Sequence, residues 1–276
     1  MIPSTQLVDC SWLAEQLADP DVVVCDCRFA GTKEASEGVY LAGHIPGAIH
    51  VFWLDDLCIA DTTVTTLLPT RVEAERSLGA LGIGRGMLVV GYTEAGSPYA
   101  ARLWRVLMHF GHARVGLLDG GIDAWGAEGR PLERERATRA PRAFEARPPN
   151  GEATVTGDEI RARLGDPELK LVDVRSPGEY EGSERRAARG GHIPGAVLLP
   201  WEGDLRTDGT LKPRDGIRRR AVEAGLRPEH ELVTYCQGGV RAAHSAFALR
   251  LAGYPCVRVY DGSWAEWGND PRLPVE

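Results

Sequence analysis

The residues best suited to chemistry lie in the six-residue run CQGGVR, from Cys236 to Arg241. The run follows an apolar, strand-like stretch, ELVTY, and precedes an alanine-rich stretch that is typical of a helix. A cysteine between a strand and a helix can sit above backbone N–H groups at the positive end of the helix, and these favour its thiolate. Because thiolates are nucleophiles, we predict a covalent reaction at Cys236.

The residues that follow Cys236 suit an anionic reaction. The glycine pair can adopt positive φ and bring its N–H groups close to the sulfur. Arg241 adds a fixed positive charge that can screen two anions as they meet. We therefore predict that substrate is bound around the thiol by the rest of the loop: Gln237, Gly238, Gly239, Val240 and Arg241.

An internal repeat indicates which elements position this loop. GHIPGA occurs at 43–48 and again at 191–196, and the strand-like runs VVVCDCR (22–28) and LKLVDVR (169–175) precede the two copies. Further strand-like runs follow in the same order, 86–92 and 114–121 in the first half and 231–236 and 258–263 in the second. The two halves are therefore copies of one unit.

The order of the elements predicts the fold. Helix-like stretches at 71–81, 98–110, 216–225 and 240–252 alternate with short, β-branched strands. This alternation predicts an α/β protein of two tandem domains, each a parallel sheet flanked by helices on both faces. A segment rich in proline and charge, 131–151, is the predicted linker between an N-terminal domain (1–130) and a C-terminal domain (152–276).

The repeat also separates scaffold from chemistry, since a feature that both halves share belongs to the scaffold. GHIPGA is shared, so His44 and His192 are predicted to be structural turn residues. The first half has YTEAGSPYAAR (92–102) in place of the cysteine loop, so its domain is predicted to be catalytically silent. His244 is predicted to be a packing or surface residue, because an ionised thiol needs no general base.

Composition excludes several classes of protein. A net charge of -7 argues against nucleic acid as a partner. The chain has no signal-peptide pattern and no apolar run long enough to span a bilayer, so we expect a cytoplasmic protein without a membrane partner. The six cysteines include no CxxC pair or zinc-like spacing, so we expect no metal and no cofactor, and we expect five of them to be buried, reduced side chains. Two domains already bury one interface, which favours a monomer.

Several of these motifs together resemble a known family, the tandem-domain rhodaneses, which include thiosulfate and 3-mercaptopyruvate sulfurtransferases. They are the paired GHIPGA segments, the Asp-x-Arg after a strand, the six-residue cysteine loop and the C-terminal DGSWAEWGNDPRLPVE. The resemblance implies that Cys236 carries sulfane sulfur as a persulfide, supplied by a small anionic donor and passed to cyanide or a thiol.

The resemblance also implies that Arg175 holds the anionic substrate. Arg28 stands at the same place in the half without a nucleophile, so a scaffold salt bridge is the alternative for Arg175, and Asp173 is expected to be structural like Asp26. Trp201 either lines the mouth of the pocket or packs.

The sequence leaves the substrate open. The loop lacks the lysine that animal thiosulfate enzymes carry two positions after the cysteine, and it differs from the Cys-Gly-Ser/Thr-Gly-Val-Thr loop of mercaptopyruvate enzymes. Glu179 stands where mercaptopyruvate enzymes tend to have an arginine, which favours thiosulfate and a likeness to bacterial thiosulfate sulfurtransferases. A 3-mercaptopyruvate sulfurtransferase is the alternative. A related cysteine phosphatase would have one more residue between cysteine and arginine, and a non-catalytic sulfur-relay or protein-binding module would need no thiol.

Overall fold

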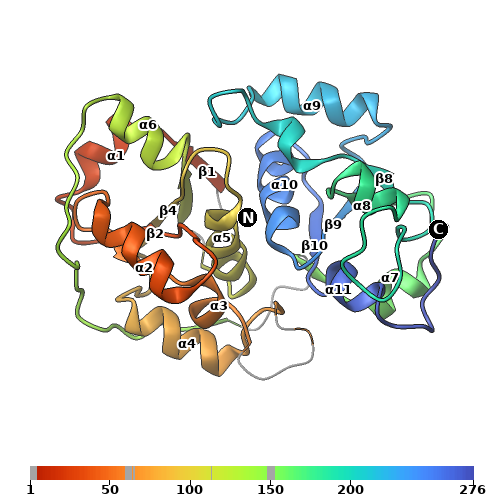
Figure 1. Cartoon of the computed structure of the whole chain (residues 1–276), viewed down its shortest axis with the longest axis horizontal. Coiled ribbons are helices and arrows are strands. Elements are labelled where there is room, and N and C mark those ends of the chain that lie inside the picture. Colours follow the sequence, from red (N-terminus) through yellow and green to blue (C-terminus); the bar gives the residue numbers. More distant parts are fainter. Residues whose placement is uncertain (1–4, 60–63, 65, 113, 148–152) are drawn as a thin grey trace. The chain divides into compact units, whose positions relative to one another are not determined.

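The computed structural model describes residues 5–59, 64, 66–112, 114–147 and 153–276, and the chain divides into two compact units (Figure 1). The first unit is formed by residues 1–60, 68–150 and 207–211. The second is formed by residues 61–67, 151–206 and 212–276. Each unit therefore includes one short segment from the other half of the sequence.

Each unit contains one parallel sheet of five strands. The first sheet has the order β1-β5-β4-β2-β3, with strands β1 (Thr5–Val8), β2 (Val22–Asp26), β3 (Ile49–His50), β4 (Leu88–Tyr92) and β5 (Val115–Leu118). The second has the order β6-β10-β9-β7-β8, with strands β6 (Thr154–Val155), β7 (Leu169–Asp173), β8 (Val197–Leu198), β9 (Glu231–Tyr235) and β10 (Val257–Tyr260). The identical strand orders confirm that the halves of the sequence are copies of one fold.

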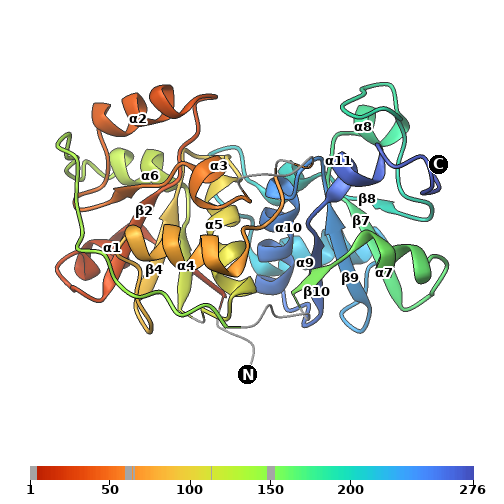
Figure 2. The ribbon, with the colours of Figure 1, turned by 90° about the horizontal axis from the view of Figure 1, so that it is seen from below.

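Helices cover both faces of the first sheet (Figure 2). They are α1 (Cys10–Gln16), α2 (Lys33–Ala42), α3 (Trp53–Asp56), α4 (Arg71–Ala80), α5 (Tyr99–His109) and α6 (Gly121–Ala127). Leu13 of α1 and Trp125 of α6 share one core with alternate residues of the strands, such as Val24 and Val90. The helix α5 contacts β4 and β5 as well. Because successive side chains of a strand point to opposite faces, this sheet is apolar on both sides.

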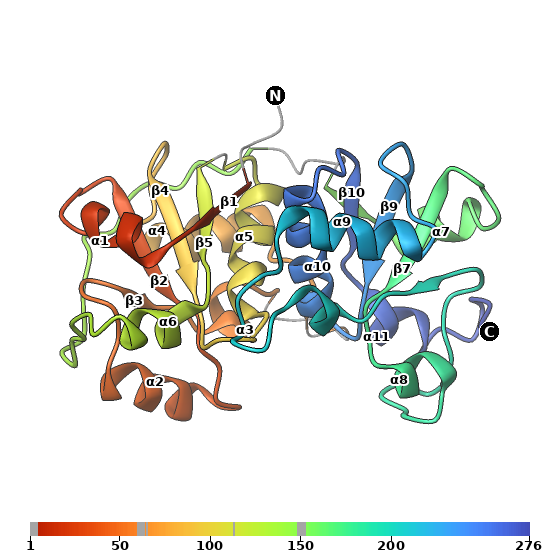
Figure 3. The ribbon, with the colours of Figure 1, turned by 90° about the horizontal axis from the view of Figure 1, so that it is seen from above.

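The second unit is built in the same way (Figure 3). Its helices are α7 (Gly157–Ala162), α8 (Pro177–Glu181), the 3-10 helix η1 (Trp201–Asp204), α9 (Arg214–Glu223), α10 (Val240–Leu251) and α11 (Ser263–Trp267). Ile160 of α7 and Trp264 of α11 pack in one core with Leu171 and Val233, and α10 contacts β9 and β10. The predicted fold class is therefore confirmed. Among the described residues, no helix is long and apolar enough to cross a bilayer.

The repeated GHIPGA segment is a turn held by side chains. His44 bonds the carbonyl of Tyr40 through Nδ1 at 3.0 Å and stacks on that ring, and His192 does the same with Tyr180. The glycine of each turn, Gly47 or Gly195, has a φ near +70° that favours glycine. The prediction that both histidines are structural is confirmed.

The cysteines differ from the prediction at one position. Cys10, Cys25, Cys27 and Cys58 are buried, but Cys256 is exposed. Cys256 comes just before β10 at the edge where the strand begins, and its carbonyl accepts the N–H of Leu232.

Candidate active site

Cys236 lies at the carboxyl end of the sheet in the second unit. It directly follows β9, which pairs with β7 and β10 in the middle of the sheet. The helix α10 begins at Val240, and its N-cap Gly239 has φ 82°. Ligands of parallel α/β sheets commonly bind at this edge, and the short loop sets the thiol against the first turn of the helix.

The thiol of Cys236 is buried and held from two directions. Its side chain is 1% exposed, and Sγ accepts the backbone N–H of Gly239 at 3.1 Å. The N–H of Cys236 donates to Ser263 Oγ at 3.2 Å, and its carbonyl accepts the N–H of Trp264 at 2.9 Å. The start of α11 therefore fixes the backbone of the cysteine, while the start of α10 supplies a donor to its sulfur.

The two residues after the cysteine are held by segments distant in sequence. The carbonyl of Gln237 accepts the N–H of Ala265 at 2.9 Å, and its Nε2 donates to the carbonyl of Arg186 at 3.0 Å. A Cβ at Gly238 would come within 2.7 Å of Oγ1 of Thr66, which belongs to the second unit through the 61–67 segment. A side chain at position 238 would therefore displace that segment.

Arg241 does not point a free charge at the thiol. Its two terminal nitrogens donate to both carboxylate oxygens of Glu179 at 2.6 and 2.9 Å, with the side chains 18% and 2% exposed respectively. Glu179 is placed by a capping box at the start of α8, because it exchanges hydrogen bonds with Ser176. The ion pair thus places the carboxylate of Glu179 next to Arg241, the last residue of the loop.

The pKa of Glu179 reports how strongly this pair is held. Burial by itself would raise it, but the hydrogen bonds and charge of Arg241, the N–H of Ser176 and the charge of Arg186 lower it from 4.5 to about 2. Burial would, in contrast, lower the pKa of Arg241, and the bond to Glu179 and an electrostatic interaction with Cys236 raise it instead. Both groups are therefore ionised at neutral pH.

Arg186 was not singled out in the sequence. Its Nε lies 3.7 Å from Glu179, its carbonyl holds Gln237, and its side chain is 60% exposed. The run SERRAARGG around it has no strand or helix pattern, and only the positive charge of the run could have drawn attention to it.

Arg175, also predicted to bind substrate, forms an ion pair of its own, and its guanidinium carbon lies 4.5 Å from the ring centroid of Trp264 and 5.7 Å from that of Tyr235. Its side chain is 1% exposed and makes a two-pronged contact with Asp173, at 2.6 Å for the shortest bond, and a further bond to the carbonyl of Gly191. Arg28 repeats the same contacts with Asp26 and Gly43 in the first unit. These shared contacts agree with the scaffold alternative for Arg175, and its role in substrate binding stays a prediction.

The loop at the same position of the first unit carries no thiol. Since β4 ends at Tyr92 and β9 at Tyr235, Thr93 stands at the place of Cys236. Its carbonyl accepts the N–H of Ile122 at 2.9 Å, and its hydroxyl donates to the carbonyl of Glu94. A hydroxyl bound to a carbonyl thus replaces the thiol in this unit.

Two further residues, Trp201 and His244, contact each other in the second unit. Trp201 is buried and meets His244 edge to face, with ring centroids 5.1 Å apart. Burial lowers the pKa of His244 to about 4, so the imidazole is neutral at pH 7. Within the described part of the chain, no histidine or carboxylate hydrogen-bonds to Sγ of Cys236, and no group of three or more His, Cys, Asp or Glu could hold a metal ion.

Comparison with known proteins agrees with this geometry. A sequence model described as Rhodanese-like domain matches residues 9–128 and again 156–270. A probable 3-mercaptopyruvate sulfurtransferase of Pseudomonas aeruginosa is 38% identical over 281 residues, covering 99% of this chain and 98% of that protein. The thiosulfate sulfurtransferase of Azotobacter vinelandii is 36% identical over 266 residues, covering 96% and 94%. The crystal structure of SseA from Escherichia coli, a 3-mercaptopyruvate sulfotransferase, matches with a TM-score of 0.83 and 29% identity over 95% of this chain and 99% of that one.

Proposed function

This chain belongs to the family of proteins with rhodanese-like domains, and from that premise we propose that it is a thiosulfate sulfurtransferase that carries sulfur as a persulfide on Cys236. The observation that supports the proposal most is the buried thiol of Cys236, which accepts the N–H of Gly239 at the start of α10. Such a donor stabilises negative charge on sulfur both before and after sulfur is bound.

The first half-reaction loads the enzyme. The thiolate of Cys236 attacks the outer sulfur of thiosulfate, a sulfur–sulfur bond forms, and the bond inside thiosulfate breaks. The electron pair of that bond leaves with sulfite, so no proton or external electron is needed. The product is a persulfide whose outer sulfur bears the charge, within reach of the backbone donors of the loop.

The second half-reaction transfers the sulfur from the enzyme to an acceptor. Cyanide or a thiolate acceptor attacks the outer sulfur of the persulfide, and the sulfur–sulfur bond to Cys236 breaks. Its electron pair returns to Sγ and regenerates the thiolate, while the acceptor leaves as thiocyanate or as a new persulfide. The same thiol therefore serves as nucleophile and as leaving group.

The charges around the loop support thiosulfate over mercaptopyruvate. Mercaptopyruvate carries a carboxylate, which a cationic side chain would bind. Both terminal nitrogens of Arg241 already donate to the carboxylate of Glu179. Thiosulfate concentrates its charge next to the reacting sulfur. Arg186, which is exposed beside Glu179, can meet the anionic end of either donor, so the preference for thiosulfate rests on Glu179 and its pair with Arg241.

The test compares two donors on the full chain. Thiocyanate formation from cyanide is measured with thiosulfate and, separately, with 3-mercaptopyruvate. We expect a higher kcat/KM with thiosulfate. A higher kcat/KM with mercaptopyruvate would assign the chain to the alternative subclass, and no turnover with either donor would favour a relay or binding module.

A pair of cysteine variants identifies the nucleophile. Cys236→Ala is expected to abolish turnover, and Cys256→Ala, which changes the exposed cysteine of the same unit, is expected to leave it unchanged. Equal losses in both variants would show that the loss is not specific to Cys236 and would contradict a persulfide on that residue.

The cellular setting follows from the same chemistry. The six cysteines form no disulfide with one another, which supports a reducing, cytoplasmic compartment. We also propose that the protein acts as a monomer, and size-exclusion chromatography with light scattering gives its mass directly.

A further inference from the structure

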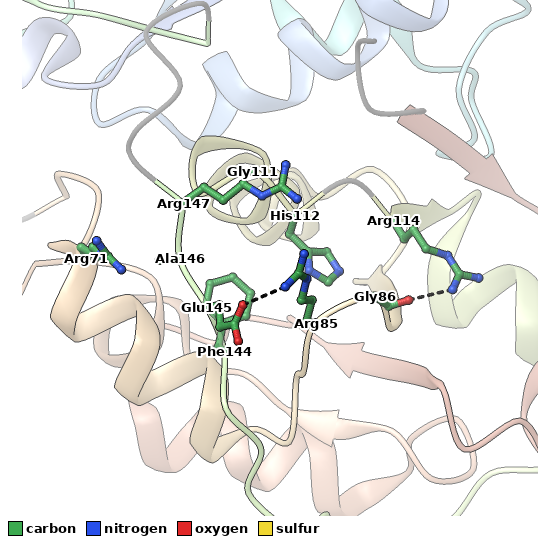
Figure 4. Close-up of a pocket in the computed structure, with 10 residues that line it drawn as sticks. All are labelled: Arg71, Arg85, Gly86, Gly111, His112, Arg114, Phe144, Glu145, Ala146 and Arg147. Atoms are coloured by element: carbon green, nitrogen blue, oxygen red, sulfur yellow. Dashed lines mark hydrogen bonds and ion pairs between the residues drawn. The ribbon is translucent and has the colours of Figure 1, made fainter.

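The first unit contains a pocket that the sulfurtransferase reaction does not use. It has a volume of about 550 Å³ and lies where β4 and β5 begin, which is the edge of the sheet opposite to the one that bears Thr93 (Figure 4). Its walls come from the residues before these two strands, from the start of α4 and from the segment 144–147. The charged and titratable side chains of the lining are Arg71, Arg85, Arg114, Arg147, Glu145 and His112.

The pocket is strongly basic although the chain as a whole has a net charge of -7. Four arginines line it against one carboxylate, Glu145, and one of them, Arg71, pairs with Glu75 at 3.0 Å. Arg85 meets Glu145 at 3.2 Å, but the two side chains are 72% and 65% exposed, so this pair contributes little and can open. Arg114 donates to the carbonyl of Gly86 at 2.7 Å. Within the described ranges, no ion pair is recorded for Arg114 or Arg147.

The walls of the pocket are fixed by the fold. The N–H of Arg147 donates to the carbonyl of Phe110 at 3.0 Å, and the stem of Arg147 packs over Gly111. Nε2 of His112 lies 2.9 Å from the carbonyl of Met87, and burial lowers the pKa of this imidazole, so the ring is neutral and structural. The positive charge of the pocket therefore comes from guanidinium groups, which stay charged at every physiological pH.

The internal repeat shows that two of these arginines, Arg85 and Arg114, are not part of the duplicated scaffold, whereas Arg71 is repeated as Arg214 at the start of α9. Since β4 begins at Leu88 and β9 at Glu231, Arg85 corresponds to Pro228. Since β5 begins at Val115 and β10 at Val257, Arg114 corresponds to Cys256. The glycine that shapes the turn is kept in both units, with φ of 73° at Gly111 and 91° at Gly253. The turn is thus common to the two units, and the charges of Arg85 and Arg114 belong to the first alone.

We propose that this pocket binds a compact small molecule with two or more phosphate groups. A guanidinium group can donate two parallel hydrogen bonds to phosphate oxygens. Arg114 and Arg147, with Arg85 when its exposed pair with Glu145 opens, match more than one phosphate. The volume falls within the range of about 300–1,000 Å³ that is usual for small-molecule sites, so a single phosphate would leave much of it to water. The aromatic side chain in the lining, Phe144, is buried, which leaves little ring surface for a nucleotide base and favours a compact ligand.

Inorganic pyrophosphate is the probe. Binding to the full chain is measured by titration calorimetry at constant ionic strength, beside orthophosphate and thiosulfate. We expect saturable binding of pyrophosphate, with orthophosphate and thiosulfate at least about tenfold weaker because each engages fewer guanidinium groups. Absence of saturable binding, or equal affinity for orthophosphate, would overturn the proposal.

Paired arginine variants locate the site. Arg114→Gln with Arg147→Gln removes two positive charges from the pocket, and Arg76→Gln with Arg134→Gln removes two exposed positive charges elsewhere in the same unit. We expect the first pair to weaken pyrophosphate by about tenfold or more and the second to leave it unchanged. Equal affinity in both pairs would contradict the assignment.

Two further readouts separate this site from the thiol. Thiocyanate formation in the Arg114→Gln, Arg147→Gln variant should match the unchanged protein, which shows that the variant is folded. Cys236→Ala should bind pyrophosphate as the unchanged protein does. Loss of pyrophosphate binding in Cys236→Ala would place the ligand at the cysteine loop and overturn the proposal.

Discussion

The ion pair between Glu179 and Arg241 predicts a large cost for Glu179→Gln. The variant keeps the shape and the capping box of α8 but leaves the guanidinium of Arg241, 18% exposed, without its carboxylate. Removing one partner of a buried pair costs about 3–5 kcal/mol. The pKa of Glu179 gives a similar figure, because each pH unit between 4.5 and about 2 corresponds to about 1.4 kcal/mol, or about 3 kcal/mol in total.

The pH dependence has a definite sign. The pKa of Glu179 is lower in the folded protein than in the unfolded chain, so its carboxylate contributes stability above pH 4.5, and that stability is lost as the pH falls toward 2. Urea unfolding at pH 7, followed by circular dichroism, should show a second unit less stable by about 3 kcal/mol, which lowers its Tm by about 10 °C. Between pH 4.5 and 2 the variant should lose less further stability than the unchanged protein.

Glu159→Gln is the matched control. Glu159 occupies the same position of a capping box at the start of α7, in the same unit, but its side chain is 49% exposed. Its partner, Arg258, also bonds Glu231, so the control should cost less than about 1 kcal/mol. If Glu179→Gln costs no more than Glu159→Gln, the pair with Arg241 does not hold the site in the way described.

Three further predictions concern single residues. Gly239→Ala should cost about 1–2 kcal/mol of stability, because its φ of 82° is unfavourable for alanine, and should lower kcat for thiocyanate formation by moving the N–H that bonds the thiol. Arg175→Met should destabilise the second unit by about 3–5 kcal/mol, and Arg28→Met should destabilise the first unit by a similar amount. Arg175→Met should not selectively raise the KM for thiosulfate. A raised KM in a stably folded Arg175 variant would show that Arg175 binds the substrate. The pKa of His244 is about 4 in the folded protein and about 6.5 in the unfolded chain, so the unchanged protein should lose about 2 kcal/mol of stability between pH 7 and 5. His244→Leu should remove this loss. An unaltered dependence of the unfolding free energy on pH, measured by urea unfolding, would contradict a buried, neutral imidazole.

The sequence predicts the parts of this protein that depend on local pattern. Apolar runs such as VVVCD and LKLVD become β2 and β7, and the helices predicted at 71–81 and 98–110 end within one residue of α4 and α5. The difference between the two halves after their fourth strands was enough to single out Cys236. Each of these signals lies within a few residues of the feature that it predicts.

The parts that the sequence could not predict depend on contacts between distant residues. Arg175 and Arg241 are the same residue type, and only the fold shows that Arg175 pairs with Asp173 and Arg241 with Glu179. Glu179 and Arg241 lie 62 positions apart, so no local pattern pairs them. The short segments 61–67 and 207–211, which pack with the unit of the other half, are beyond local pattern for the same reason.

The central claim is that Cys236 carries the transferred sulfur, and the most direct test is the mass of the loaded protein. The full chain is incubated with thiosulfate, separated from it, and measured by intact-protein mass spectrometry, with the modified peptide then sequenced. We expect the peptide that contains Cys236 to gain one sulfur atom. This sulfur should be lost again when cyanide is added, and Cys236→Ala should not gain it. A sulfur atom on another cysteine, or no gain of mass while thiocyanate is still formed, would contradict the central claim.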